Sequence, residues 1–195
     1  MAVPQTRTGY IHGCRGLVLT PLLATGGMPV TPTRFGIRTA QSVDGTPVYE
    51  AGDRSALWGG DALLAVRIRN PVIIGLDLTF RNARMDARAV EIVGGGTRIE
   101  AGGATVGYNA PLMSAVARTP FLAEAFAENF LGQGVTHGFL RITFPFCIGR
   151  APKPPVMTDN EWAIAELEVS VQENPVLAMP VYRWEFVDVL PVELV

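Results

Sequence analysis

Glycine and proline interrupt this chain more often than they interrupt most globular sequences. The chain holds 21 glycines and 15 prolines in 195 residues, above the roughly 12 % of positions that average usage gives. Both residues favour turns and weaken helix interiors, so a mostly helical bundle is excluded. We expect short strands joined by many turns, in a single domain that spans residues 1–195.

Charged residues are scarce as well. They make up 17 % of the chain, and hydrophobic residues make up 48 %, whereas globular domains carry about 25 % charged residues. We interpret the shortfall as a surface that is covered in the working state, most simply by copies of the same chain. The sequence has no basic tract, which argues against sequence-specific nucleic-acid binding. Prolines and glycines break the uncharged stretch 16–33, so we expect a soluble protein without a membrane span, made in the cytoplasm.

Alternation of apolar and polar residues predicts most of the strands. Residues 62–69 and 72–81 alternate and are joined by Asn70-Pro71, which predicts a hairpin. A short strand is expected over 35–40, and three later strands over 138–148, 162–172 and 181–190. Residues 1–34 are expected to form an extended, turn-rich arm that docks through leucines. Residues 41–61 are expected to form a long polar loop, and loops of more than about 12–15 residues are usually functional.

Two segments carry helix signals. One is Met85–Val93, with Asn82 as the expected cap and the glycines at 94–96 as its end. The other runs from Pro120 to Phe130, with Thr119 as the cap and proline at the first helical position. The chain is therefore expected to be mainly β, a β-sandwich or partial barrel with one or two flanking helices.

Residues that could carry catalysis or bind a metal are few. His12 and Cys14 are two possible ligands, but a zinc site needs three or four. Cys14 and Cys147 could form one disulfide, although two isolated small hydrophobes are the preferred interpretation. Glu166 and Glu168 could serve as acid and base of a glycosidase, but such a pair is ordinary on any polar strand face. We therefore expect no enzyme, no catalytic residue, no metal and no cofactor.

The order of elements resembles a known family. A long loop closes on Trp58-Gly59-Gly60-Asp61, and a strand and the segment Gly75–Phe80 lead to the first helix. Near the end of the chain, an acidic alternating strand precedes an aromatic one that holds Tyr182, Trp184 and Phe186. Over most of residues 35–191 this order resembles the tail tube proteins of long-tailed bacteriophages. The segments 1–34 and 99–138 match less clearly, which leaves a tail terminator or a head decoration protein as alternatives within the virion.

The resemblance implies a function. Tail tube proteins form hexameric rings in which strands from each copy complete one inner barrel. The rings stack into a tube that conducts DNA during ejection. The implied partners are copies of the same chain, other tail proteins at the ends of the tube, and DNA in transient, non-specific passage. The implied location is the tail of the virion, with no membrane contact.

The resemblance also assigns roles to residues. The loop residues that would contact the next ring are Val48, Tyr49, Leu57 and Trp58. The residues that would face the lumen are Glu166, Glu168, Ser170 and Gln172, and the two glutamates would hold DNA off the wall by like-charge repulsion. Arg67 and Arg69 would pair with acids of a neighbouring copy, or would make the lumen attractive to DNA.

A function of another class stays open at this stage. A monomeric β-barrel module could bind a small ligand or a glycan, with Trp58, Trp162 and Trp184 as stacking platforms. The two hypotheses differ in oligomeric state, because only the first needs copies of the chain to complete its sheets.

Overall fold

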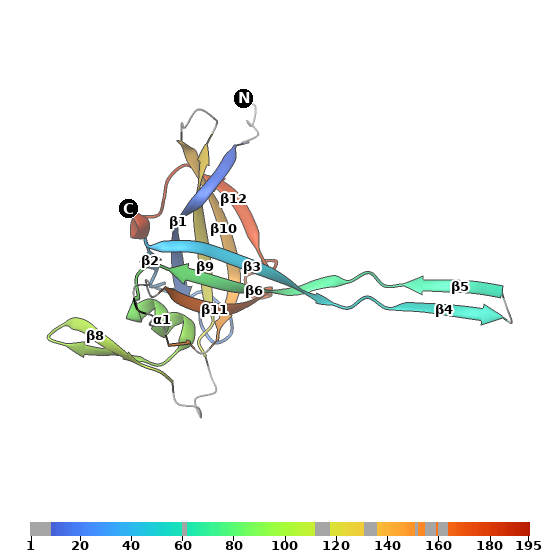
Figure 1. The fold of residues 1–195 in the computed structure, drawn as a ribbon, viewed down its shortest axis with the longest axis horizontal. Coiled ribbons are helices and arrows are strands. Elements are labelled where there is room, and N and C mark those ends of the chain that lie inside the picture. Colours follow the sequence, from blue (N-terminus) through green and yellow to red (C-terminus); the bar gives the residue numbers. More distant parts are fainter. Residues whose placement is uncertain are drawn as a thin grey trace.

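A computed structural model describes residues 9–59, 62–111, 118–130, 136–150, 152–154, 159 and 164–195. The fold is mainly β, as the sequence predicts, with one short α-helix among the residues described (Figure 1). In chain order the elements are β1 (Tyr10–Pro21), β2 (Phe35–Ile37), β3 (Ala40–Glu50), β4 (Arg54–Gly59), β5 (Ala62–Ile68), β6 (Val72–Asn82), α1 (Ala87–Gly94), β7 (Thr97–Ala101), β8 (Ala104–Asn109), β9 (Phe121–Phe130), β10 (Thr136–Gly149), β11 (Ala165–Gln172), β12 (Arg183–Val187) and the 3-10 turn η1 (Val192–Leu194).

One large antiparallel sheet forms the body. Its strand order is β2-β1-β9-β10-β11-β6-β3, and β12 pairs with the first part of β10. In Figure 1 the strands β3, β6 and β11 run across β1, β9 and β10, so the sheet folds over itself. The outermost strands β2 and β3 do not pair with each other in the part of the chain that the structure describes, so the sheet stays open there.

The core fills the space between the two parts of the sheet. Leu17 and Leu19 of β1 and Phe144 of β10 face Phe80 of β6 and Val169 of β11, and all five are buried. A smaller apolar cluster lies on the outer face, where Leu194 packs with Val18 and Phe126. The described elements thus bury one main core, and the C-terminal turn packs on the outer face of the sheet through Leu194.

Helix α1 confirms the first helix prediction, with a different cap. Its N-cap is Asp86, whose Oδ1 accepts hydrogen bonds from the backbone N–H groups of Arg88 (2.9 Å) and Ala89 (3.4 Å). The expected cap, Asn82, is instead the buried last residue of β6, and its side chain accepts a hydrogen bond from Thr39. Gly95 ends the helix at a positive φ, a backbone conformation that favours glycine.

The second helix prediction is wrong, because residues 121–130 form strand β9. This strand lies between β1 and β10 and is covered on both faces. Its inner face holds Phe121 and Ala123, and its outer face holds Leu122 and Phe126, all buried. A strand buried on both faces loses the apolar–polar alternation. Without that alternation, the main local signal was the Thr119-Pro120 pair, which is typical of the start of a helix.

The predicted hairpin of residues 62–69 and 72–81 is also wrong. Strand β5 pairs with β4, and β6 pairs with β3, so Asn70-Pro71 joins two strands that continue in one direction. The predicted loop 41–61 is the other half of this long ribbon. Pro47 is tolerated in β3 because β3 is an edge strand, where the missing N–H breaks no ladder.

Part of the predicted N-terminal arm, residues 1–34, is a central strand. Strand β1 covers residues 10–21 and pairs with β2 on one side and β9 on the other. Leu17, Leu19 and Leu22 are buried in the sheet, as expected of the leucines in this segment, whereas Leu23, expected to dock with them, is exposed. Residues 1–8 lie outside the described part.

Candidate assembly surfaces

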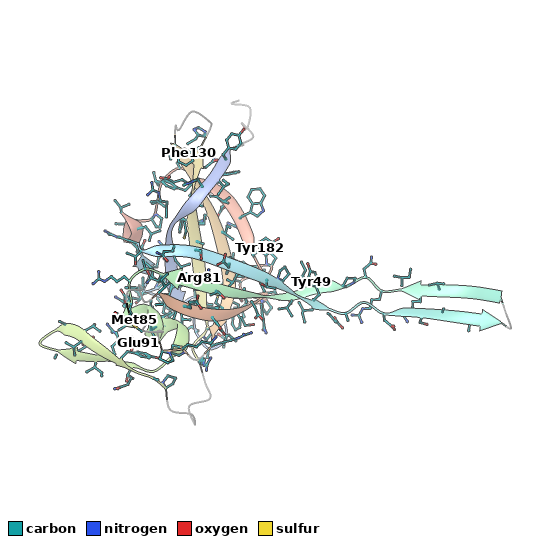
Figure 2. All side chains as sticks on the ribbon, viewed as in Figure 1. Tyr49, Arg81, Met85, Glu91, Phe130 and Tyr182 are labelled. Carbon is teal, nitrogen blue, oxygen red and sulfur yellow. The ribbon has the colours of Figure 1, made fainter. Side chains whose placement is uncertain are left out.

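A two-stranded ribbon projects from the body and is the most prominent feature of the molecule (Figure 1). We call it the arm and define it as residues 48–59 and 62–74. The register pairs Tyr49 with Ile73 near its base and Leu57 with Ala65 farther out. Figure 2 shows Tyr49 where the ribbon leaves the body.

The arm exposes many large apolar side chains. Among the arm side chains that the structure describes, the exposed large apolar ones are Val48, Tyr49, Leu57, Val66, Ile68, Val72, Ile73 and Ile74. An isolated two-stranded ribbon is marginally stable in water, even with favourable side chains. Contiguous apolar surface of this kind marks an interaction site or an aggregation hazard. The arm is therefore a surface that another molecule is expected to cover.

The structure places the predicted contact residues on this arm, although in strands and not in a loop. Val48 and Tyr49 lie at its base, and Leu57 lies in β4. Trp58 is also in β4, but its side chain is outside the described part. Arg69 lies 3.3 Å from Glu50 of the paired strand. Arg67 is exposed and has no carboxylate partner among the described residues.

Strand β11 carries the residues that the sequence assigned to a lumen. Glu166, Glu168, Ser170 and Gln172 share one face, as predicted, while the alternate residues of the strand are buried. The structure adds basic partners that the sequence did not reveal. Glu166 lies 2.9 Å from Arg81 of the neighbouring strand β6.

Glu168 is paired twice. Lys153 forms a hydrogen-bonded ion pair with it, and Arg150 lies 3.7 Å away. The Lys153 hydrogen bond and charge, with help from Arg150, lower the pKa of Glu168 below its ordinary value. Arg150 also lies 3.0 Å from Asp77. The face of β11 is thus a lattice of alternating charges and not an acidic stripe.

The remaining candidates for chemistry are not brought together. Cys14 is half-buried and Cys147 is buried, both are free thiols, and burial raises the pKa of each. Among the described residues no group of three or more His, Cys, Asp or Glu side chains is placed to hold a metal ion. Glu166 and Glu168, the residues that could serve as acid and base, are each engaged by basic side chains.

The tryptophans of the ligand-binding alternative are only partly described. Trp184 of β12 is 58 % exposed and contacts Phe186 edge to face, with ring centroids 5.8 Å apart. Tyr182 is exposed nearby. The side chain of Trp58 and all of Trp162 lie outside the described residues.

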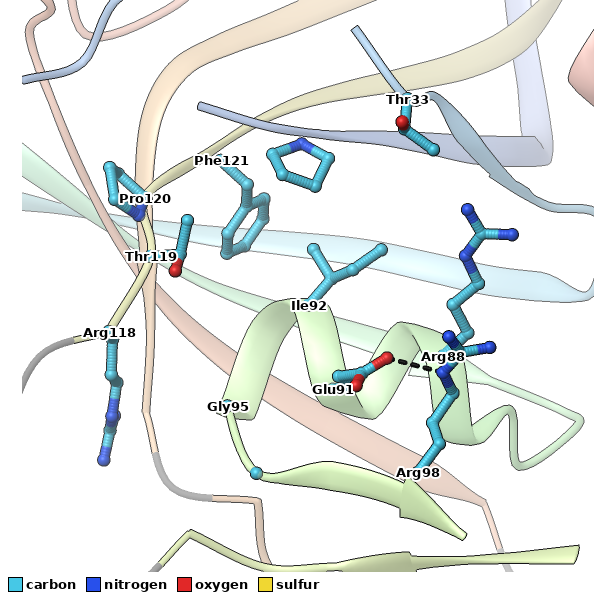
Figure 3. A pocket seen from close by; sticks show the side chains of 12 residues that line it. Thr33, Arg88, Glu91, Ile92, Gly95, Arg98, Arg118, Thr119, Pro120 and Phe121 are labelled. Atoms are coloured by element: carbon cyan, nitrogen blue, oxygen red, sulfur yellow. Dashed lines mark hydrogen bonds and ion pairs between the residues drawn. The ribbon is translucent and has the colours of Figure 1, made fainter. Parts of the chain in front are cut away.

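Two hollows flank helix α1, and sequence reasoning did not find them. The smaller one, about 460 Å³, is open to solvent between α1 and the start of β9 (Figure 3). Its wall includes Ile92 and Phe121, together with Glu91 and Arg98, which form an ion pair of 2.6 Å.

The larger hollow lies between α1 and the hairpin β7–β8 and measures about 970 Å³. We call it the α1 groove. Its basic lining residues are Arg84, Arg88, Arg98 and Lys153, and its apolar lining residues include Phe35, Met85, Val90, Val106 and Pro154. The clustering of three arginines within residues 84–98 was the one sequence signal for it.

Comparisons with known proteins identify no family. No family model matches this sequence, and no curated protein matches it. A solved chain from the anti-feeding prophage (AFP) baseplate, a 6-fold symmetrised cryo-EM structure, resembles the fold with a TM-score of 0.41 and 8 % sequence identity. The similarity covers 97 % of this chain and 100 % of that chain. Within the described residues, no helix is long and apolar enough to cross a bilayer.

Proposed function

We propose that this chain is a structural subunit of a bacteriophage tail tube, and that its copies form hexameric rings that stack end to end. The observation that carries the proposal is the arm. A ribbon that exposes apolar side chains such as Leu57, Ile68 and Ile73 is costly to leave in water. Contact with another copy would cover it. The order of the first helix, the acidic strand and the aromatic strand, in which the sequence resembles tail tube proteins, supports the same assignment.

The open sheet supports assembly as well. Strands β2 and β3 end the strand order, and unpaired edges invite association with other chains. Closing strands across copies into an inner barrel would remove such edges. In a ring of this kind, β11 is our candidate for the wall of the lumen.

A lumen wall built from β11 would suit the passage of DNA. Its carboxylates at Glu166 and Glu168 are balanced by Arg81, Arg150 and Lys153. The wall would therefore neither bind the phosphate backbone tightly nor repel it strongly. The proposed role is mechanical, with no catalysis and no cofactor. The subunit would reside in the virion tail, with other tail proteins at the ends of the tube.

An armless variant tests the proposal. Val48 and Gly75 face each other in the β3–β6 ladder, so residues 49–74 can be replaced by an Asn-Gly turn that closes the shortened hairpin. We expect this variant to keep the circular dichroism spectrum and the cooperative unfolding of the body. Sedimentation velocity should show that it no longer forms the large assemblies of the full chain.

The matched control removes exposed apolar surface elsewhere. Val189 and Val192 are exposed near the C-terminus, and their double replacement by threonine leaves the arm intact. This control should assemble as the full chain does. Equal sedimentation of the armless variant and the full chain would refute the role of the arm.

A further inference from the structure

The α1 groove presents positive charge that the described part of the chain does not fully neutralise. Among its described lining residues Asp86 is the only carboxylate; it caps α1 and keeps its negative charge, which offsets part of the positive charge of the groove. Arg98 is paired with Glu91 and Glu100, and Lys153 with Glu168. Arg84 and Arg88 have no carboxylate partner among the described residues.

The geometry holds Arg88 in place without neutralising it. Its guanidinium lies over the ring of Phe35, 4.9 Å from the ring centroid. A cation on an aromatic face is oriented but keeps its full charge. Arg84 is exposed and also lines the groove. Two arginines are therefore available to one carboxylate-bearing occupant.

The groove also exposes apolar surface. Met85 is 55 % exposed and Val106 is 62 % exposed on opposite walls, one beside α1 and one in β8. Figure 2 shows Met85 and Glu91 on this side of the body, away from the arm. The groove measures about 970 Å³. A molecule that fits this groove would therefore present apolar side chains and a carboxylate, on a segment long enough to fill the space.

The arm has this chemistry. Asp53 lies at the bend between β3 and β4, is exposed, and has no cationic partner among the described residues. Its backbone carbonyl accepts a hydrogen bond from the N–H of Arg69 (2.8 Å), which fixes the bend and leaves the carboxylate to solvent. Exposed Tyr49, Leu57 and Ile68 lie on either side of it.

The two surfaces lie at opposite ends of the molecule. In Figure 1 the arm leaves one end of the long axis, and α1 with the hairpin β7–β8 lies toward the other end. A copy shifted along this axis would bring its arm to the groove of the next copy. Because such a contact joins two different surfaces, it can repeat without limit along a stack.

We propose that the arm of one copy docks in the α1 groove of the next, with Asp53 against Arg84 and Arg88. The inference rests on the proposed function and specifies the surface that receives the arm. It predicts that the contact is head to tail and depends on charge. An apolar association of one arm with another arm would be neither.

Charge reversal on each surface tests the docking. The variants are Arg84→Glu with Arg88→Glu in the groove, and Asp53→Arg in the arm. Each alone should weaken association at least ~10-fold in sedimentation velocity, because like charges then face each other. When the groove variant and the arm variant are mixed in equal amounts, they should associate as the unmodified chain does. In the mixture the reversed arm meets the reversed groove, and the unmodified arm meets the unmodified groove.

Two further variants keep the outcome interpretable. Glu173→Arg reverses an exposed carboxylate of the body and should leave association unchanged. Arg84→Glu alone disturbs no packing in the described structure and should show a smaller defect of the same kind.

The outcomes separate the docking from the proposed function. If the reversals leave association intact while the armless variant loses it, the docking proposal fails and the proposed function stands. If the armless variant also assembles, the proposed function fails too. Loss of association without recovery in the mixture likewise overturns the docking.

Discussion

Glu124 of β9 and Arg141 of β10 form an ion pair of 3.2 Å on the outer face of the sheet, although Glu124 is only 7 % exposed. Arg34 lies 2.7 Å from the same carboxylate and 3.2 Å from Glu193 near the C-terminus. This network joins the segment before β2, the centre of the sheet and the C-terminal turn. It complements the packing of Leu194 on the outer face.

Removal of the central carboxylate should therefore be costly. Glu124→Gln removes the negative charge that Arg34 and Arg141 share. Removing one partner of a largely buried ion pair leaves the other charge without its partner, which is strongly destabilising. We expect the free energy of unfolding to fall by about 2–4 kcal/mol, measured by urea titration. Glu166→Gln, on the exposed face of β11, should cost less than about 1 kcal/mol. Equal losses in the two variants would contradict this account of the network.

The pH dependence of stability should include a contribution from Glu185. Hydrogen bonds from Arg183 and Arg141 lower the pKa of Glu185 below its ordinary value of 4.5. Because the pKa of Glu185 is lower in the folded chain than in the unfolded chain, its ionised carboxylate stabilises the fold fully at pH values above the unfolded-state pKa. This stabilisation is lost as the pH falls through the folded-state pKa. The stability gap between the wild type and Glu185→Gln should therefore narrow between about pH 5 and pH 3. Unfolding midpoints across this range measure the gap, and a gap that does not change with pH would refute the assignment.

The two thiols should differ in reactivity. Cys147 is fully buried in the core, and Cys14 is half-buried beside the irregularity in β1. Burial raises the pKa of both, so little thiolate is present near neutral pH. An aromatic disulfide reagent should label at most one thiol per folded chain, slowly, and both in urea. Cys14→Ser should abolish labelling of the folded chain, and rapid reaction of two thiols would show that the core is open.

The side chain of Asp86, which caps α1, is expected to stabilise the folded chain. Asp86→Ala removes the acceptor for two backbone N–H groups at the start of a helix of only eight residues. We expect a loss of about 1 kcal/mol in unfolding free energy. Asp44→Ala removes an exposed carboxylate 3.7 Å from Arg81 and serves as the control, with little expected change because exposed ion pairs contribute little. If Asp86→Ala unfolds at the same urea concentration as the wild type, the cap is not stabilising.

Sequence patterns identified strands where one face meets the core and the other meets water. Strand β11 is such a strand, and its faces were predicted residue by residue. In β6 the alternation of residues 72–81 matches the burial of Leu76, Leu78 and Phe80, whereas Val72 and Ile74 belong to the arm and are exposed. Alternation cannot tell whether a strand has left the body.

Pairing and burial on both faces were beyond the sequence. Asn70-Pro71 is an acceptable turn by its sequence, and only tertiary packing decides whether the strands on either side of it pair with each other. Strand β9 has apolar residues on both faces, a pattern that local signals cannot separate from a helix. The α1 groove joins residues from Phe35 to Pro154, and no local pattern reports their proximity.

Negative-stain electron microscopy of the purified full chain, from low to high concentration, tests the central claim most directly. The account predicts rings of six copies with an open centre, which stack into tubes as the concentration rises. A single species of monomer at every concentration, confirmed by sedimentation, would contradict it.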